Sequence, residues 1–104
     1  MRLYVSGPIT HMPELNKPVF AAVSASLRGA GHTVTNPHEI GAPGEQMLPW
    51  EGYLRAALIA MLTGADAIAL LSGWERSRGA TLEHHVATAL GWEVRPWTDW
   101  LDSP

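Results

Sequence analysis

The chain has 104 residues, enough for one ordinary domain and too few for a second catalytic module. Hydrophobic residues make up 46% of it and charged residues 16%, which excludes a disordered chain and predicts a compact domain. The formal net charge of −3 argues against a nucleic-acid-binding surface while allowing free nucleotides as ligands, and the absence of cysteine excludes disulfides, thiolate metal sites and a cysteine nucleophile.

Two short apolar runs in the first third of the chain, residues 3–6 and 32–35, predict buried strands. Each is followed by a turn that contains proline, which cannot continue a central strand. Between them, Asn16 predicts the N-cap of a helix whose apolar residues recur at helical spacing as far as Gly29. Strand, helix and strand in this order are the unit from which parallel sheets are built.

The middle of the chain predicts the same pattern again. Residues 50–62 are expected to form a helix, and residues 67–71, which are all apolar, a buried strand. No apolar run approaches the roughly 20 residues that cross a bilayer, and the apolar start is too short for a secretory signal. We therefore expect a cytoplasmic protein without a membrane span. The apolar residues expected on the buried face of this helix are Leu54, Leu58, Met61 and Leu62.

The last third predicts a helix from about residue 79 to Gly91 and a strand over residues 92–96. Leucine and valine recur along this helix at helical spacing, and we expect them to be buried. These residues are Leu82, Val86 and Leu90. The alternation along the whole chain predicts an α/β fold with a small parallel sheet.

Tryptophans gather near the C-terminus of the chain, at Trp92, Trp97 and Trp100. In so small a domain, aromatic side chains of this kind often cover an interface between subunits. We therefore expect a homo-oligomer, either a dimer or a tetramer.

Three loops are expected to form a ligand pocket, since ligands of open parallel sheets bind beyond the carboxyl ends of the strands. These loops are residues 6–16, 36–49 and 72–79. The first begins with Ser6, Gly7 and Pro8, whose backbone and hydroxyl groups suit a sugar or a phosphate, although ordinary turn chemistry is the more frequent reason for such a sequence.

The third loop holds the most specific pattern, residues 74–83. Ser77, Arg78 and Gly79 at a helix N-terminus would bind a phosphate through hydroxyl, guanidinium and backbone N–H groups. Glu83 is expected in the first turn of that helix, where the helix dipole favours the ionised carboxylate and would make it available as a nucleophile. The alternative is that Glu83 is there only because a first-turn glutamate suits the dipole.

The remaining candidate residues are aromatic or basic. Trp50 and Trp74 lie on or beside the pocket loops, where an indole would either stack on a base or pack in the core. His84 and His85 are adjacent and so point about 100° apart on a helix, which prevents them from binding one metal ion together. We expect neither a metal nor a cofactor.

Four segments of the chain resemble the nucleoside 2-deoxyribosyltransferase-like superfamily: residues 4–8, 31–37, 65–71 and 77–83. The likeness covers nearly the whole chain and is greatest to a branch of small proteins that are often encoded by phages. It implies a single domain over residues 1–104, with a flavodoxin/Rossmann-like three-layer sandwich and a parallel sheet of about four to five strands. It also implies cleavage of the N-glycosidic bond of a nucleoside or nucleotide.

In the resembling enzymes a glutamate attacks the anomeric carbon, and Glu83 falls at its position. Ser77, six residues earlier, is similar to the serine of deoxynucleoside 5′-monophosphate N-hydrolases, whereas an aspartate there is typical of enzymes acting on nucleosides. Two departures accompany this match. The first loop has Pro8 and Ile9 where that branch has serine and glycines, and Ala56 and Ala57 occupy the region where an aspartate usually faces the pocket.

Two hypotheses about function follow. In the first, Glu83 attacks C1′ of a nucleoside or nucleotide, Glu51 replaces the missing aspartate, and either Glu51 or a histidine protonates the leaving base. In the second, the protein only binds or senses a nucleotide, because the supporting aspartate is absent. A structural oligomer with a vestigial pocket ranks last. The partner in the first two hypotheses is a small-molecule nucleoside or nucleotide.

Overall fold

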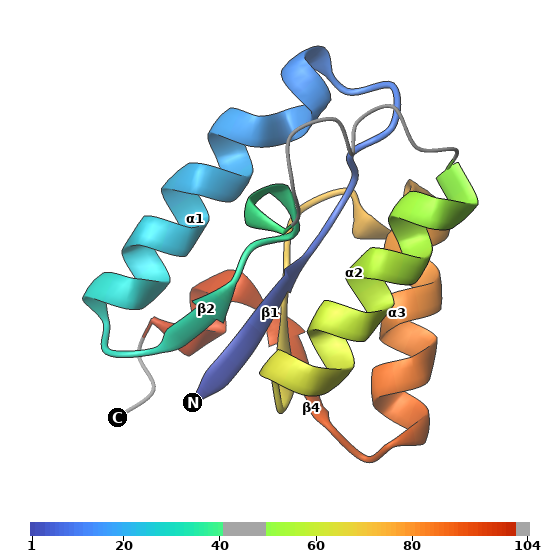
Figure 1. Ribbon diagram of the computed structural model, residues 1–104. Helices are drawn as coiled ribbons and strands as arrows, with labels where there is room; N and C mark the ends of the chain where they lie inside the picture. The colour runs from blue at the N-terminus through green and yellow to red at the C-terminus, as the bar shows by residue number, and fades with distance from the viewer. Residues whose placement is uncertain (41–49, 102–104) are drawn as a thin grey trace.

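The computed structural model describes residues 1–40 and 50–101, and it has three layers (Figure 1). A parallel four-stranded sheet has the order β2-β1-β3-β4. Helix α1 covers one face of the sheet, and α2 and α3 cover the other. The strands are β1 (Arg2–Ser6), β2 (Thr33–Thr35), β3 (Ala67–Leu70) and β4 (Glu93–Pro96), and the helices are α1 (Lys17–Gly29), α2 (Trp50–Gly64) and α3 (Arg78–Ala89). The predicted α/β sandwich is confirmed.

The central strand β1 contributes to both cores because successive side chains of a strand point to opposite faces. Leu3 and Val5 belong to the cluster under α1, whereas Tyr4 belongs to the cluster under α2 and α3. All residues of β1 after Arg2 are buried. Strand β3 beside it is buried along its whole length, as expected for a central strand of a parallel sheet.

The predicted buried face of α3 is right for Val86, which packs against the core, and wrong for the two leucines. Leu82 and Leu90 are 37% and 54% exposed, while the buried residues of this helix are Ala80, Glu83 and Ala87. Two small alanines allow the helix to pack closely, and the leucines then lie towards solvent. The same error affects α2, where Met61 is fully buried but Leu62 is 45% exposed.

The predicted side-chain cap at Asn16 is also wrong. Asn16 precedes α1 but has a left-handed φ of 61°, and its side chain makes no capping hydrogen bond. Instead its Nδ2 donates to the Pro8 carbonyl at 2.9 Å, within the buried interior. Asn16 therefore fixes the loop after β1 rather than the helix.

The C-terminal segment, a 3-10 helix over Trp97–Trp100, packs against the domain's own core. Trp100 is 2% exposed, and its Nε1 donates to the Ile68 carbonyl at 3.0 Å. The prediction that Trp100 covers a subunit interface is therefore wrong, because the core of the same chain already buries it. Among the described residues, no helix has the length and apolar character to cross a membrane.

Candidate active site

The most unusual polar group of the domain is the Glu83 carboxylate, which is only 6% exposed. It lies on α3 and faces β1, where two hydroxyl groups donate to it. The Tyr4 hydroxyl donates to Oε2 at 2.6 Å, and Ser6 Oγ donates to Oε1 at 2.8 Å. Tyr4 and Ser6 are two residues apart on a strand, so they project from the same face of the sheet. Each oxygen of the Glu83 carboxylate therefore accepts a hydrogen bond from a residue of β1.

Burial and hydrogen bonding act in opposite directions on this carboxyl group. Burial raises the pKa of Glu83 above its ordinary value, and the hydrogen bonds from Tyr4 and Ser6 lower it by a smaller amount. The pKa of Tyr4 is raised well above 10.0, first by its own burial and then by the charge of Glu83. Tyr4 therefore stays protonated near neutral pH and remains a donor to the carboxylate.

The predicted position of Glu83 in the first helical turn is wrong. Helix α3 begins at Arg78, directly after its N-cap Ser77, so Glu83 lies in the second turn. The influence of the helix dipole falls off within the first turn. The dipole therefore does not account for Glu83, and the structure explains its setting by the hydroxyl groups of Tyr4 and Ser6.

A pocket opens above Glu83 at the carboxyl ends of β1 and β3, as expected from the parallel sheet. Its free volume, counting the part open to solvent, is about 470 Å³. Described residues of all three predicted loops line it, while residues 41–49 of the second loop lie outside the described part. The lining residues are Tyr4, Gly7, Ile9, Thr10, Pro37, Tyr53, Leu54, Ala57, Ser77, Gly79, Ala80 and Glu83.

Ser77 and Gly79 meet at the pocket as predicted, and Ser77 also has a structural role. Its Oγ accepts the Ala80 N–H at 3.1 Å and so caps α3. A hydroxyl that accepts through oxygen still has its hydrogen to donate to a ligand. The Gly79 N–H belongs to the first turn, where the helix itself supplies no acceptor. Both groups are therefore donors suited to an anion.

Gly7 lines the pocket because the chain passes very close to β3 there. A Cβ on Gly7 would stand 2.6 Å from Leu71 Cβ, which no substitution could accept without a shift of the backbone. The adjacent Pro8 is not among the lining residues, and its carbonyl accepts from Asn16. Of the predicted trio, Ser6 thus contacts Glu83, Gly7 lines the pocket, and Pro8 supports the loop.

Three other predicted residues are not among those that line the pocket. Arg78 and Glu51 are exposed, on the first turns of α3 and α2. Trp74 stacks on His84, with ring centroids 4.4 Å apart and an interplanar angle of 9°. The structure therefore gives Trp74 a partner within the protein in place of a base. The side chain of Trp50 lies outside the described part of the structure.

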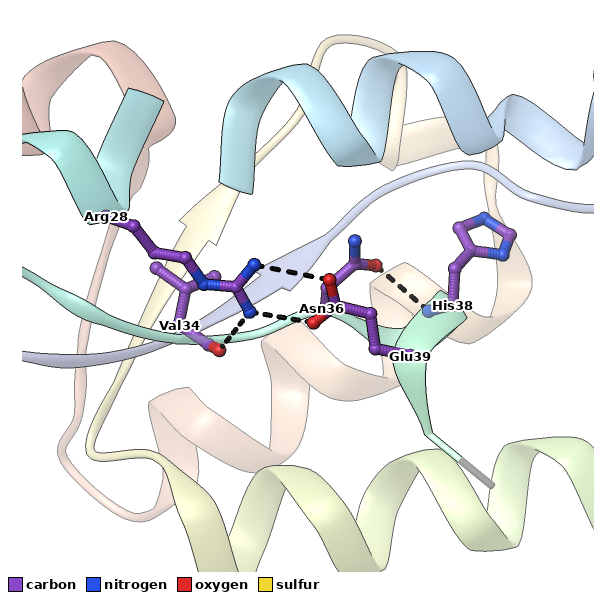
Figure 2. A network of polar contacts seen from close by, with 5 residues as sticks. All are labelled: Arg28, Val34, Asn36, His38 and Glu39. Carbon is purple, nitrogen blue, oxygen red and sulfur yellow. Dashed lines mark hydrogen bonds and ion pairs between the residues drawn. The ribbon is translucent and has the colours of Figure 1, made fainter. Parts of the chain in front are cut away.

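Pro37 is brought to the pocket by a polar network on the other side of its turn, a short 3-10 helix over Pro37–Glu39 (Figure 2). The Arg28 guanidinium donates to both carboxylate oxygens of Glu39, at 2.7 and 3.2 Å, and to the Val34 carbonyl at 2.9 Å. Asn36 Oδ1 accepts the His38 N–H at 2.9 Å and closes the turn. Helix α1 thereby holds the loop that follows β2.

Tyr4 is the site residue that the sequence reasoning did not identify. The available signal was the alternation of Tyr4 and Ser6 along a strand whose other residues are apolar, because a buried tyrosine hydroxyl requires a hydrogen-bond partner. Tyr53, which lies on α2 and also lines the pocket, was not identified either. Within the described residues, no three histidine, aspartate or glutamate side chains lie close enough to share a metal ion.

Comparison with known protein families gives a match over most of the chain. The profile of a family described as a domain of unknown function, DUF4406, matches residues 1–95. Neither the curated proteins nor the solved structures contain a significant match to the chain.

Proposed function

Because the chain belongs to the DUF4406 family, whose description assigns no reaction, its function must be inferred from the pocket, and we propose that it cleaves the N-glycosidic bond of a nucleoside 5′-monophosphate. The observation that carries the proposal is the Glu83 carboxylate, buried in the wall of a pocket at the carboxyl edge of the sheet and oriented by two hydroxyl donors. Burial of an ionisable group has a free-energy cost, and groups of this kind are concentrated at active sites.

In the proposed reaction, Glu83 attacks C1′ of the sugar. A bond forms between a carboxylate oxygen and C1′ while the C1′–N bond breaks, and the base leaves with the bonding electron pair and takes up a proton. Water or a second base then displaces the carboxylate from the sugar. Tyr4 and Ser6 hold the attacking group in position, and the negative charge of Glu83 stabilises the oxocarbenium-like transition state. This chemistry requires no cofactor.

The remaining pocket wall suggests how such a substrate would be oriented. Ser77 and Gly79 supply donors at the N-terminus of α3, which suits a 5′-phosphate. Ile9, Pro37 and Tyr53 supply an apolar and aromatic surface, which suits a planar base. The phosphate and the base would therefore bind at separate parts of the pocket, with the sugar near Glu83.

One observation favours the alternative of a nucleotide-binding protein without catalysis. Helix α2 presents Leu54 and Ala57 to the pocket, both apolar, and Glu51 is exposed elsewhere on the same helix. Glu83 is thus the single carboxylate among the described lining residues, whereas glycoside hydrolysis commonly uses two. Binding without turnover would follow if the base must be protonated by a second acid.

We also propose that the protein forms a homo-oligomer. The observation that supports an oligomer is the exposure of large apolar side chains along α2 and α3. These are Ile59, Leu62, Leu82 and Leu90. Light scattering after size-exclusion chromatography would show a mass above 11.3 kDa if the proposal is right and the monomer mass if it is wrong.

The test is to incubate the protein with a panel of nucleosides and 5′-monophosphates and to measure free base by chromatography. Glu83→Gln serves as the matched control because it keeps the side-chain shape and removes the nucleophile. Base released from monophosphates by the wild type alone would support the enzyme. A monophosphate that raises the melting temperature of both proteins without release of base would favour the binding protein, and neither effect would contradict both hypotheses.

A further inference from the structure

A second cavity lies at the carboxyl ends of β3 and β4. The turn after β3, which includes Ser72 and Trp74, forms one wall, and the segment after β4, which includes Trp97 and Thr98, forms the other. Its volume is about 320 Å³, at the lower end of the range of small-molecule sites. Among the described residues, none lines both this cavity and the one beside Glu83.

The two tryptophans of this cavity are fixed by different parts of the core. Trp74 packs against the cluster under α2 and α3, and Trp97 packs against the cluster under α1. Both indoles are half-buried, and the stack on His84 restrains Trp74 further. Rigid indoles offer a binding surface at little cost in conformational entropy, and the electron-rich face of an indole attracts cations.

The charge of the residues that line the cavity also favours a cation. Its polar side chains are those of Ser72, Glu75 and Thr98, so among the described residues the lining carries one formal charge, and that charge is negative. Arg76 lies beside the same turn, with Nη2 3.1 Å from the position that a Cβ on Gly73 would take, and is not among the lining residues. The combination of indoles and one carboxylate is typical of sites for alkylammonium groups.

We propose that this cavity binds a small organic cation with an alkylammonium group. The cation contacts the indoles of Trp74 and Trp97, and the carboxylate of Glu75 balances its charge. This second site does not depend on the reaction proposed for Glu83, since it uses separate residues and requires no turnover.

The test is isothermal titration calorimetry with choline as the cation and 3,3-dimethylbutan-1-ol as its uncharged counterpart of the same shape. We expect choline to bind with a Kd of about 1–10 mM, as for a single small cationic contact, and the alcohol to bind at least tenfold more weakly. Glu75→Gln, a change on the exposed rim that leaves the core untouched, should weaken choline binding at least fivefold. Trp97→Leu should abolish it.

Glu14→Gln is the matched control, because Glu14 is an exposed glutamate outside the cavity, and it should leave choline binding unchanged. Three results would overturn the proposal. They are the absence of binding heat with choline up to about 100 mM, equal binding of choline and the alcohol, and equal choline binding by the wild type and Glu75→Gln. Because the readout is choline binding, a failure here leaves the N-glycosidase proposal unaffected, and the reverse also holds.

Discussion

Glu83 and Asp66 belong to opposite ends of the same sheet and are held in opposite ways. At the carboxyl edge, Glu83 is buried, its partners are the neutral hydroxyls of Tyr4 and Ser6, and burial raises its pKa. At the amino edge, Asp66 is exposed and paired with the Arg2 guanidinium at 2.9 Å, and this hydrogen bond lowers its pKa. Asp66 thus has the partner that stabilises a carboxylate best, while the partners of Glu83 among the described residues are uncharged.

This difference separates a structural carboxylate from a candidate functional one. An exposed ion pair contributes little to stability, but its geometry satisfies both charges. A buried carboxylate with only neutral donors is less stable as an anion and therefore more reactive towards an electrophilic carbon. Four predictions test this difference between the two carboxylates, in order of decreasing expected effect.

Glu83→Gln should reduce the rate of base release by about a thousandfold or more, because it removes the attacking oxygen. Nucleotide binding, measured as the rise in melting temperature, should be retained. Asp66→Asn is the control at the other edge of the sheet and should leave the rate unchanged. If both variants lost activity equally, the contrast between the two carboxylates would have no functional meaning.

Tyr4→Phe should lower the free energy of unfolding by about 1–3 kcal/mol, the usual cost of removing a partner from a buried polar group. Since the Tyr4 hydrogen bond lowers the pKa of Glu83, its loss should move the acid limb of the pH–rate profile to higher pH. Chemical denaturation and the pH dependence of kcat/KM measure the two effects. An unshifted acid limb would mean that Tyr4 does not act through Glu83.

The pH dependence of stability should have opposite signs at the two carboxylates. The folded-state pKa of Glu83 is raised, so its contribution is full below the ordinary value of 4.5 and is lost as pH rises through the folded pKa. The folded-state pKa of Asp66 is lowered, so its contribution is present above 3.8 and is lost as pH falls through the folded pKa.

Unfolding curves of Glu83→Gln and Asp66→Asn, each compared with the wild type from pH 3 to 7, measure these contributions. The free energy of unfolding of the wild type minus that of the variant should fall with rising pH for Glu83→Gln and should rise for Asp66→Asn. Curves of the same sign would contradict the assignment of opposite environments.

Arg2→Gln should have the smallest effect of the four. It removes the cation of an exposed pair at the amino edge and should change the denaturation midpoint less than Tyr4→Phe does, without altering nucleotide binding. A loss of stability larger than that of Tyr4→Phe would show that the amino edge matters more for folding than burial suggests.

The fold was predictable because its signals are local. Proline and glycine end the strands at Gly7 and Pro37, and the all-apolar residues 67–71 identify the central strand β3. The parallel arrangement then follows from the alternation of strands and helices, and it places the pocket at the carboxyl edge. Gly7, Ser77, Gly79 and Glu83 accordingly line one pocket there.

The rest depends on packing that composition does not determine. Hydrophobicity ranks Leu82 and Leu90 above Ala80 and Ala87, but the alanines are buried because α3 packs closely on the sheet. The sequence allows Trp74 either to stack on a base or to pack in the core, and the structure has it against the core and stacked on His84, a contact that depends on the rotation of α3. Contacts such as these are set by how the helices pack on the sheet, which the local sequence pattern does not determine.

The most direct test of the central claim is mass spectrometry of the protein after incubation with a 2′-deoxy-2′-fluoronucleoside 5′-monophosphate. The fluorine destabilises the oxocarbenium-like transition state and so slows hydrolysis of a glycosyl ester. The account predicts a mass increase equal to the fluorinated sugar phosphate, located on the peptide that contains Glu83 and absent from Glu83→Gln. Base release from natural substrate by Glu83→Gln at the wild-type rate, with no adduct on Glu83 in the wild type, would contradict it.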